Sequence, residues 1–291
     1  VVDAPERGEP PLDPAEIDSP AGCCRAGAGP ARPLAALPAR AHAEAMSEAA
    51  PGRMEYELGA LIDYRFRAQG GNGPGYTTIV GSGANACILH YVTNDSPLKE
   101  GDLVLIDAGC ELFNYTADVT RTLPVDGTFT PLQRDLYQLV LDAQEAGIEA
   151  VRPGAAFQDP HRAAMRVLAH GLDDLGLLPV SAEESLADDN KTYARWTLHG
   201  TSHMLGMDVH DCGRAAPEAY AKGTLAEGMV LTVEPGLYFQ EDDLLVPEEL
   251  RGIGIRIEDD ILVTADGYDN LSASLPRTPD AVEEWMGQRI R

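Results

Sequence analysis

The chain has 291 residues, 44% of them hydrophobic, and carries 47 acidic against 22 basic side chains, for a formal net charge of −25. This content supports a buried core for one large domain or two ordinary ones, and so acidic a surface repels nucleic acid and anionic membranes. No apolar run is long enough to span a bilayer, and five cysteines without a CxxC pair fit a reducing compartment, so we expect a cytoplasmic protein with no nucleic-acid or membrane partner.

The first part of the chain is expected to be irregular. Residues 1–40 mix Pro, Gly, Ala and Arg in no helical or alternating pattern, and regular structure is expected from about residue 41. A helix is predicted over 55–69, because apolar residues recur there on one helical face. Strands are then predicted over 77–80, 86–91, 103–108 and 118–123.

The second half is predicted to hold two helices and then more strands. The first helix starts at Pro131, where Thr130 and Gln133 form a capping box, and runs to about residue 151. The second covers about 160–175, and a polar loop follows over 180–195. Strands are predicted over 229–233, 236–239, 254–258 and 260–264, with a C-terminal helix from about residue 279. This order indicates an α+β sheet between helices.

Two aspartates stand out in the first half. Asp107 ends the apolar run LVLI, and Asp118 begins the next predicted strand. A bare carboxylate costs several kcal/mol to bury, so Asp107 has to be paired or to bind a cation. A hairpin of this length brings both carboxylates to one point, which favours a functional site.

Two glutamates occupy comparable places in the second half. Glu234 ends the apolar strand VLTV before a Pro-Gly turn, and Glu258 lies in GIRIEDDILV. By alternation Arg256 shares the face of Glu258, where it either pairs with a neighbouring carboxylate or steers substrate or a metal carboxylate. Asp259 and Asp260 are expected to support the site or the fold.

Histidines cluster in the segment LHGTSHMLGMDVHD. Its members His199, His203 and His210 are interleaved with glycine and apolar residues, which favours a site, and His90 in CILHY is a further candidate. The spacing is not the HExxH of the zinc-protease helix. The other histidines lack such a context and are predicted to lie on the surface: His42, His161 and His170.

Four carboxylates and one imidazole form the candidate ligand set, namely Asp107, Asp118, His203, Glu234 and Glu258. This hard, oxygen-rich set suits two divalent ions such as Mn²⁺, with Co²⁺, Zn²⁺ or Fe²⁺ as alternatives, better than one tetrahedral zinc. Two metal ions held by carboxylates can hydrolyse amide bonds.

From about residue 41 to 275 the chain resembles the catalytic domain of the Xaa-Pro aminopeptidases (aminopeptidase P) of metallopeptidase family M24, which also holds prolidase, methionine aminopeptidase and creatinase. The resemblance rests on six segments in the family's order: NACILHY, LVLIDAGCE, ADVTRTLPVDGTFT, HGTSHMLGMDVHD, LTVEPGLY and RGIGIRIEDDILVT. It implies the pita-bread α+β fold with pseudo-two-fold internal symmetry and a dinuclear site, usually with manganese.

The resemblance also implies a role for each matched residue. Asp107 would hold one metal, Asp118 and Glu258 would bridge the two, and His203 and Glu234 would complete the second. Glu234 could also shuttle a proton, while His90 and His210 would surround the proline side and steady the tetrahedral intermediate. Three further residues would contact substrate or orient those that do: Tyr76, Tyr238 and Arg256.

The chain differs from the family in its N-terminal part. The organisation expected is an irregular N-terminal remnant over 1–40, the pita-bread catalytic domain over 41–278, and a C-terminal helix or tail over 279–291. Family members carry an N-terminal domain that helps form oligomers and closes the substrate groove, and here it is almost all missing. Our hypothesis is a truncated or frame-shifted reading frame, which would weaken any homo-oligomer.

Three functions compete. The first is a manganese-dependent exopeptidase that releases an N-terminal residue linked to proline. The second is a prolidase that cleaves Xaa-Pro dipeptides. The third is a non-catalytic peptide-binding scaffold of the same fold, which the complete ligand set disfavours.

Overall fold

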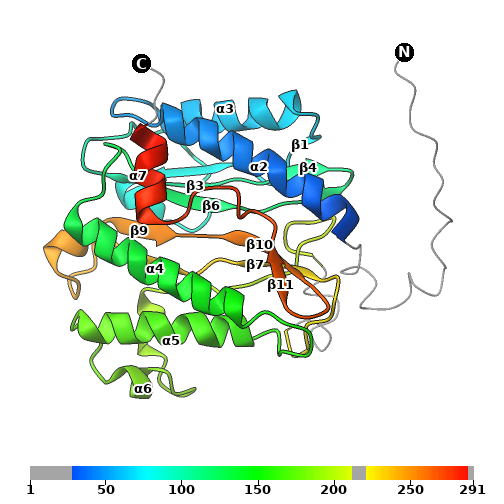
Figure 1. Ribbon diagram of the computed structural model, residues 1–291. Coiled ribbons are helices and arrows are strands. Elements are labelled where there is room, and N and C mark those ends of the chain that lie inside the picture. Colours follow the sequence, from blue (N-terminus) through cyan, green and yellow to red (C-terminus); the bar gives the residue numbers. More distant parts are fainter. Residues whose placement is uncertain (1–27, 212–220, 288–291) are drawn as a thin grey trace, which may run out of the picture.

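The structure is a computed structural model that describes residues 28–211 and 221–287. Its strands lie between two groups of helices, with α2 (Ala28–Glu48) and α3 (Glu55–Ala68) on one side and α4 (Pro131–Glu149) and α5 (Asp159–Asp174) on the other (Figure 1). The smaller helical elements are α6 (Ala182–Ser185), α7 (Pro279–Gly287), and the 3-10 turns η1 (Gly83–Cys87), η2 (Thr192–Arg195) and η3 (Glu248–Leu250). None of the helices in the described part of the chain has the length and apolar character needed to cross a bilayer.

Helix α2 begins earlier than the composition indicates. It starts at Ala28, so the expected irregular segment 1–40 is wrong for residues 28–40, and residues 1–27 lie outside the described part. The later turns bury Ala41 and Ala45 completely, and such small side chains let the helix lie close to the sheet. Alanine also has the strongest intrinsic preference for a helix, which the prolines of this segment obscured.

Within the described residues the strands pair in three three-stranded sheets and one two-stranded sheet, all antiparallel. The first half supplies the sheet β2-β3-β6 and the second half the sheet β11-β10-β7, while β8 pairs with β9 and β4 lies between β1 and β5. The bounds are β1 Gly73–Pro74, β2 Ile79–Ser82, β3 Leu103–Asp107, β4 Cys110–Leu112, β5 Tyr115–Thr116, β6 Thr120–Pro124, β7 Val230–Val233, β8 Gly236–Phe239, β9 Ile253–Arg256, β10 Asp259–Val263 and β11 Tyr268–Asn270. A bridge between Thr120 and Glu258 joins the two halves.

Two local predictions are wrong. The expected strand 86–91 is absent, since η1 covers its beginning and no strand follows before β3. Ala86 and Cys87 instead belong to one buried cluster with Tyr238 of β8, and the Cys87 Sγ lies 3.4 Å from the carbonyl oxygen of Phe239. The expected loop 180–195 contains α6, which the Ser181 side chain caps by accepting a hydrogen bond from the Glu184 amide.

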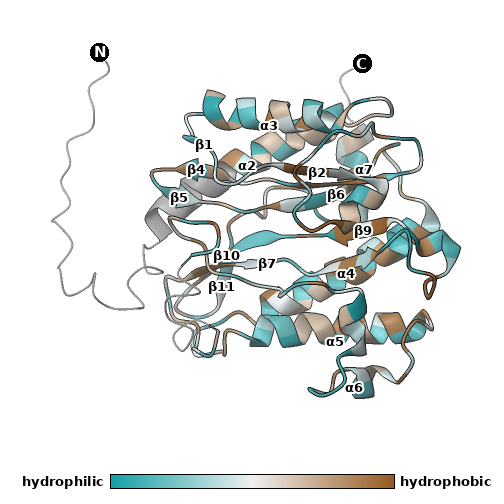
Figure 2. Ribbon diagram, turned by 180° about the vertical axis from the view of Figure 1, so that it is seen from behind, coloured by the Kyte–Doolittle hydropathy of each residue, from teal (hydrophilic) through white to brown (hydrophobic). Residues whose placement is uncertain are grey.

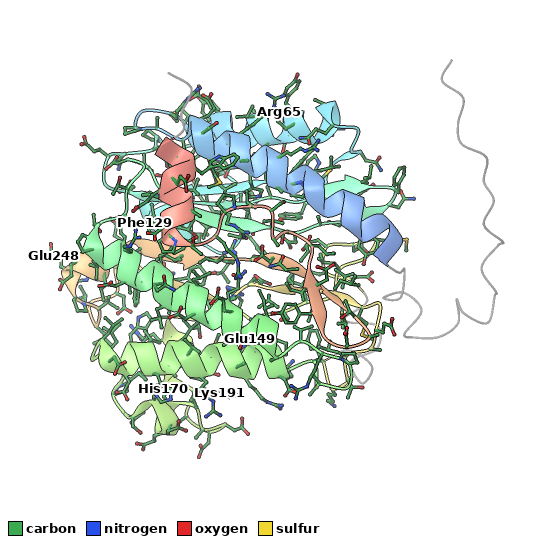
Figure 3. All side chains as sticks on the ribbon, in the orientation of Figure 1. Arg65, Phe129, Glu149, His170, Lys191 and Glu248 are labelled. Carbon is green, nitrogen blue, oxygen red and sulfur yellow. The ribbon has the colours of Figure 1, made fainter. Side chains whose placement is uncertain are left out.

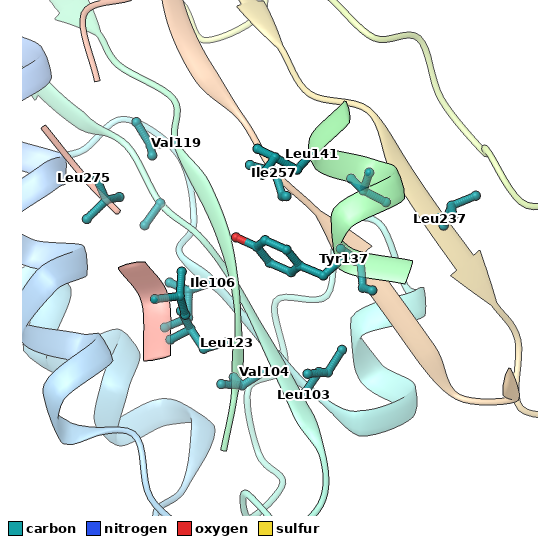
Figure 4. Packing of buried hydrophobic residues seen from close by; sticks show 14 of the residues in the cluster. Leu103, Val104, Ile106, Val119, Leu123, Tyr137, Leu141, Leu237, Ile257 and Leu275 are labelled. Carbon is teal, nitrogen blue, oxygen red and sulfur yellow. The ribbon is translucent and has the colours of Figure 1, made fainter. Parts of the chain in front are cut away.

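The start of α4 and the main core agree with the sequence pattern. The Thr130 hydroxyl accepts a hydrogen bond from the Gln133 amide at 3.2 Å, and the Gln133 side chain accepts one from the Thr130 amide at 2.9 Å. Tyr137 of α4 extends toward the strands beside Leu141 and Ile257 (Figure 4). Figure 2 shows hydrophobic colour on β2 and β9, and hydrophilic and hydrophobic residues alternating along α3, α4 and α5.

Candidate metal centre

All five candidate ligands line one cavity of about 520 Å³. Asp107 is the last residue of β3, and Asp118 lies two residues before β6. Glu234 follows β7, and Glu258 separates β9 from β10. His203 reaches the cavity from a loop that pairs with β7, because its amide and carbonyl groups bond Thr232. The strand ends of both halves therefore converge on a single point.

His203 presents one ring nitrogen to the carboxylates. Its Nδ1 lies 3.3 Å from the carbonyl oxygen of Met204, which can only accept, so Nδ1 carries the proton and Nε2 keeps its lone pair. Nε2 lies 3.4 Å from Asp118 and 3.5 Å from Glu234, longer than an ordinary N–H···O hydrogen bond. Ligand atoms of Asp118, His203 and Glu258 all lie within 4.8 Å of one another, a spacing that one ion could span.

Asp107 forms an ion pair with the side chain of Arg256. The Arg256 guanidinium donates to its Oδ2 at 2.6 Å, and the Tyr76 hydroxyl lies 2.5 Å from its Oδ1 and also contacts Asp118. Burial by itself raises the pKa of Asp107, but the charge of Arg256 and the bond from Tyr76 outweigh it and leave the pKa below its usual range. Arg256 therefore pairs with a candidate metal carboxylate, one of the two roles expected for it.

The other three carboxylates have too little positive charge near them to offset their burial, so their pKa values are raised. Burial, followed by the charges of Asp107 and Glu234, raises the pKa of Asp118 well above its usual value. Burial and then Asp118 do the same to the pKa of Glu258, whose buried Oε1 has no hydrogen-bond partner. Burial raises the pKa of Glu234 to about 6. Crowded, buried carboxylates with an orphaned oxygen fit divalent cations, so the residues present suit the metal that the ligand set predicts.

One wall of the cavity carries histidines among apolar side chains. His90 and His210 have ring centroids 6.3 Å apart, and His210 stands edge-on to His203 at 4.5 Å. Both His90 and His210 are exposed, as a group that contacts substrate must be. The apolar members of the same lining are Ile79, Leu89, Val92 and Val209.

Tyr238 fits one of the two roles expected for it. It is fully buried and does not line the cavity, so the expected contact with substrate is corrected and the orienting role remains. Its hydroxyl accepts a hydrogen bond from Arg256 at 3.0 Å and lies 2.6 Å from the Nε2 of His199. His199 Nδ1 donates to the carbonyl oxygen of Gly200, so Nε2 accepts from Tyr238. The chain of bonds from Arg256 through Tyr238 fixes the His199 ring.

His199 is the site residue to which the sequence assigned no role. Its Nδ1 lies 3.5 Å from Glu234, and burial lowers its pKa to about 4, so it is neutral at neutral pH. The cluster of three histidines was the signal that pointed to it. Of the histidines expected on the surface, His170 lies on the outer side of α5 near α6 (Figure 3), 3.2 Å from Glu183, whereas His42 is fully buried and that expectation is wrong.

A second row of buried residues holds the carboxylates in place. Asp260 accepts from the amide of Asp118 at 3.2 Å. Arg121 and Asp259, neither of them exposed, form an ion pair at 2.7 Å, and Arg121 also donates to the carbonyl oxygen of Glu258. The expected supporting role of Asp259 and Asp260 matches this placement. His161, expected on the surface, is instead half-buried, with its Nδ1 3.0 Å from Thr201.

Comparison with known proteins agrees with this geometry. Residues 32–265 match metallopeptidase family M24. The chain is 62% identical over 217 residues to Xaa-Pro aminopeptidase 1 of Streptomyces coelicolor, covering 74% of this chain and 44% of that protein. It is 45% identical over 250 residues to the Xaa-Pro aminopeptidase of Escherichia coli, covering 86% and 56%.

The fold matches as well. The aminopeptidase PepP of Pseudomonas aeruginosa superimposes with a TM-score of 0.84 at 44% identity, covering 89% of this chain and 58% of that one. The chain thus spans about half the length of the curated relatives it matches. The expected pita-bread α+β fold is confirmed, and the chain belongs to metallopeptidase family M24.

Proposed function

We propose that the chain is a dinuclear-metal exopeptidase, with Mn²⁺ as its ions, that releases an N-terminal residue linked to proline. The observation that carries the proposal is the convergence of five ligand-type side chains on one cavity with an apolar, histidine-bearing wall. The proposal is also supported by the comparisons, because the relatives cited above are Xaa-Pro aminopeptidases.

The ligands divide by their surroundings. Asp118, His203 and Glu258 form the tight cluster, while Asp107 and Glu234 line the same cavity. When bound, divalent ions would polarise the scissile carbonyl and activate water for attack. Arg256 orients Asp107, and the carbonyl of Met204 orients His203, so each keeps its ligand atom aimed at the cavity.

Glu234 is suited to move a proton. Its carboxylate lines the cavity beside His203, where it would take a proton from attacking water and return it to the departing proline nitrogen. The Nδ1 of His199 lies 3.5 Å from the same carboxylate, but the ring is neutral and therefore adds no positive charge beside it.

Substrate would lie against the wall formed by His90 and His210. Apolar neighbours such as Leu89 and Val92 fit a proline ring, and imidazole N–H groups can donate to the oxyanion that develops in the transition state. Tyr76 lines the same cavity and is placed to touch both the carboxylates and the substrate.

The test uses the purified chain after chelation, with and without Mn²⁺. The substrates are an Xaa-Pro-Xaa tripeptide, the same peptide with alanine for proline, and an Xaa-Pro dipeptide. We expect metal-restored release of the first residue from the proline tripeptide only. Preference for the dipeptide would instead indicate a prolidase.

Two variants test whether the turnover comes from this site. Glu258→Gln should lower kcat/KM by about a hundredfold or more, on the scale of losing a group that acts in the transition state. Glu241→Gln removes an exposed carboxylate of the same charge and should change nothing. Turnover that needs no metal, or that survives Glu258→Gln, would overturn the proposal.

We also propose a cytoplasmic location, supported by the free thiols of Cys87 and Cys110, which fit a reducing compartment. The homo-oligomer stays a prediction.

A further inference from the structure

Glu55 is a buried carboxylate outside the candidate metal centre. It is the first residue of α3, has no exposed surface, and does not line the cavity. Four donors from a single segment, residues 82–96, converge on it: Ser82 N at 2.7 Å, Asn85 Nδ2 at 3.0 Å, Tyr91 Oη at 2.8 Å and Ser96 N at 2.9 Å. An ionised carboxylate only accepts hydrogen bonds, so it matches all four donors at once.

The segment that Glu55 holds forms a wall of the cavity. Leu89, His90 and Val92 all come from it and line the space where substrate would bind. No strand supports the segment between β2 and β3, so its shape depends on side-chain contacts.

Hydrogen bonds fix the wall at both of its ends, and Tyr91 joins its tip to Glu55. At the near end Gln240 donates to the carbonyl oxygen of Cys87 at 3.0 Å, and at the far end the Asn94 side chain bonds Thr78 and Val80. Between these points the Tyr91 hydroxyl reaches inward to Glu55, one residue after His90.

We propose that Glu55 is a positioning residue for the histidine wall, setting where His90 stands against the substrate without touching substrate or metal. The inference rests on the proposed function for its kinetic consequence, but its structural part does not. The alternative is that Glu55 only stabilises the N-terminus of α3 through the helix dipole. In that case the loss of its charge would lower the stability of the whole fold and would not affect this wall in particular.

The first test is a double-mutant cycle on kcat/KM. Glu55→Gln places an amide N–H among donors, and Tyr91→Phe removes a single hydroxyl while keeping the ring. Each is measured with His90 present and with His90→Ala. The matched control is Glu57→Gln on the same helix, where the side chain oxygen can still accept from the Met54 amide.

With His90 present, Tyr91→Phe should lower kcat/KM on the order of three- to tenfold, mainly through kcat because His90 acts on the transition state, and Glu55→Gln should lower it more. With alanine at position 90 both effects should shrink to about twofold or less, because the group they position is gone. Affinity for Mn²⁺ should not change. Equal losses in both backgrounds, or a loss of Mn²⁺ binding, would overturn the inference.

Hydrogen exchange supplies a readout that needs no turnover. In both variants the amides of residues 86–92 should exchange faster than in the parent, while those of β3 keep their protection. Unchanged amide exchange rates over residues 86–92 in both variants would contradict the proposal. If the parent cleaves no peptide, the proposed function fails, and the exchange comparison still decides the role of Glu55. Tyr91→Phe keeps the test available should Glu55→Gln not fold.

Discussion

Replacing Gly109 with alanine should separate Asp107 from Asp118 although both ligands remain in the sequence. Gly109 packs against the segment between β5 and β6 that carries Asp118, and a Cβ at this position would stand 1.7 Å from the carbonyl oxygen of Ala117. It would also stand 2.9 Å from the ring of Tyr76, whose hydroxyl contacts both aspartates. The added methyl group therefore wedges the hairpin open beside the candidate metal centre.

The cost follows from what has to move. A backbone carbonyl cannot rotate away as a flexible side chain can, and real Cβ contacts essentially never fall below 3.0 Å, so the backbone at Gly109 and the backbone at Ala117 must part by more than about 1 Å. Overpacking against such a fixed neighbour costs about 3 kcal/mol, which lowers the melting temperature of a chain of this size by about 6–12 °C. A displacement of about 1 Å between catalytic groups can cost about a hundredfold in rate.

The assay pairs Mn²⁺ titration calorimetry with peptide turnover below the melting temperature of the variant. The matched control is Gly267→Ala, where a Cβ meets nothing within 4 Å. We expect Gly109→Ala to bind Mn²⁺ weakly and to lose about a hundredfold in kcat/KM, and Gly267→Ala to match the parent. A folded Gly109→Ala protein with parental metal affinity and turnover would show that the reasoning about this hairpin is incorrect.

Three further predictions concern the ligands, the buried histidine and the buried ion pair. Mn²⁺ at 100 times its Kd should stabilise the parent by about 2.7 kcal/mol in thermal unfolding, and Glu258→Gln should abolish that gain. Burial lowers the pKa of His42 to about 4, so the unfolded chain takes up the proton first as the pH falls. The resulting stability is complete above pH 6.5 and is lost toward pH 4, up to about 3 kcal/mol. Urea unfolding at pH 7 and pH 5 should show this loss in the parent and in His170→Gln, but less of it in His42→Gln. Arg121→Met strands the carboxylate of Asp259 and should cost about 3–5 kcal/mol in urea unfolding, while a cost below about 1 kcal/mol would contradict the buried-pair argument.

The residues that the sequence predicted best carry local signals. Asp107 and Glu234 each end an apolar run, so a polar group at the end of a buried strand could be read without knowing its partners. The start of α4 rests on residues three apart, Thr130 and Gln133, which bond each other in the structure. In such cases the physical cause lies within a few residues of its effect.

The residues that the sequence missed depend on partners far along the chain. The segment around His90 has the apolar alternation of a strand, but its donors bond Glu55, which lies in another element, so no ladder forms. His42 looks like a polar residue on an alanine-rich helix. Its Nε2 lies 3.1 Å from the carbonyl oxygen of Ala108, 66 residues away, and nothing near it in sequence indicates that contact.

The candidate metal centre exists only where the two halves of the chain meet. The amide of Glu258 donates to the carbonyl oxygen of Thr120, and the Thr120 hydroxyl donates to the Glu258 carboxylate at 2.5 Å. Arg121, next along the same strand, bonds the carbonyl of Glu258 and pairs with Asp259. The unfolded chain holds Asp118 and Glu258 far apart, so it cannot present the cluster, and the free energy of metal binding adds to the docking of the halves. The repulsion among these carboxylates opposes that docking until a cation offsets it, and metal affinity and fold stability are therefore coupled in this protein.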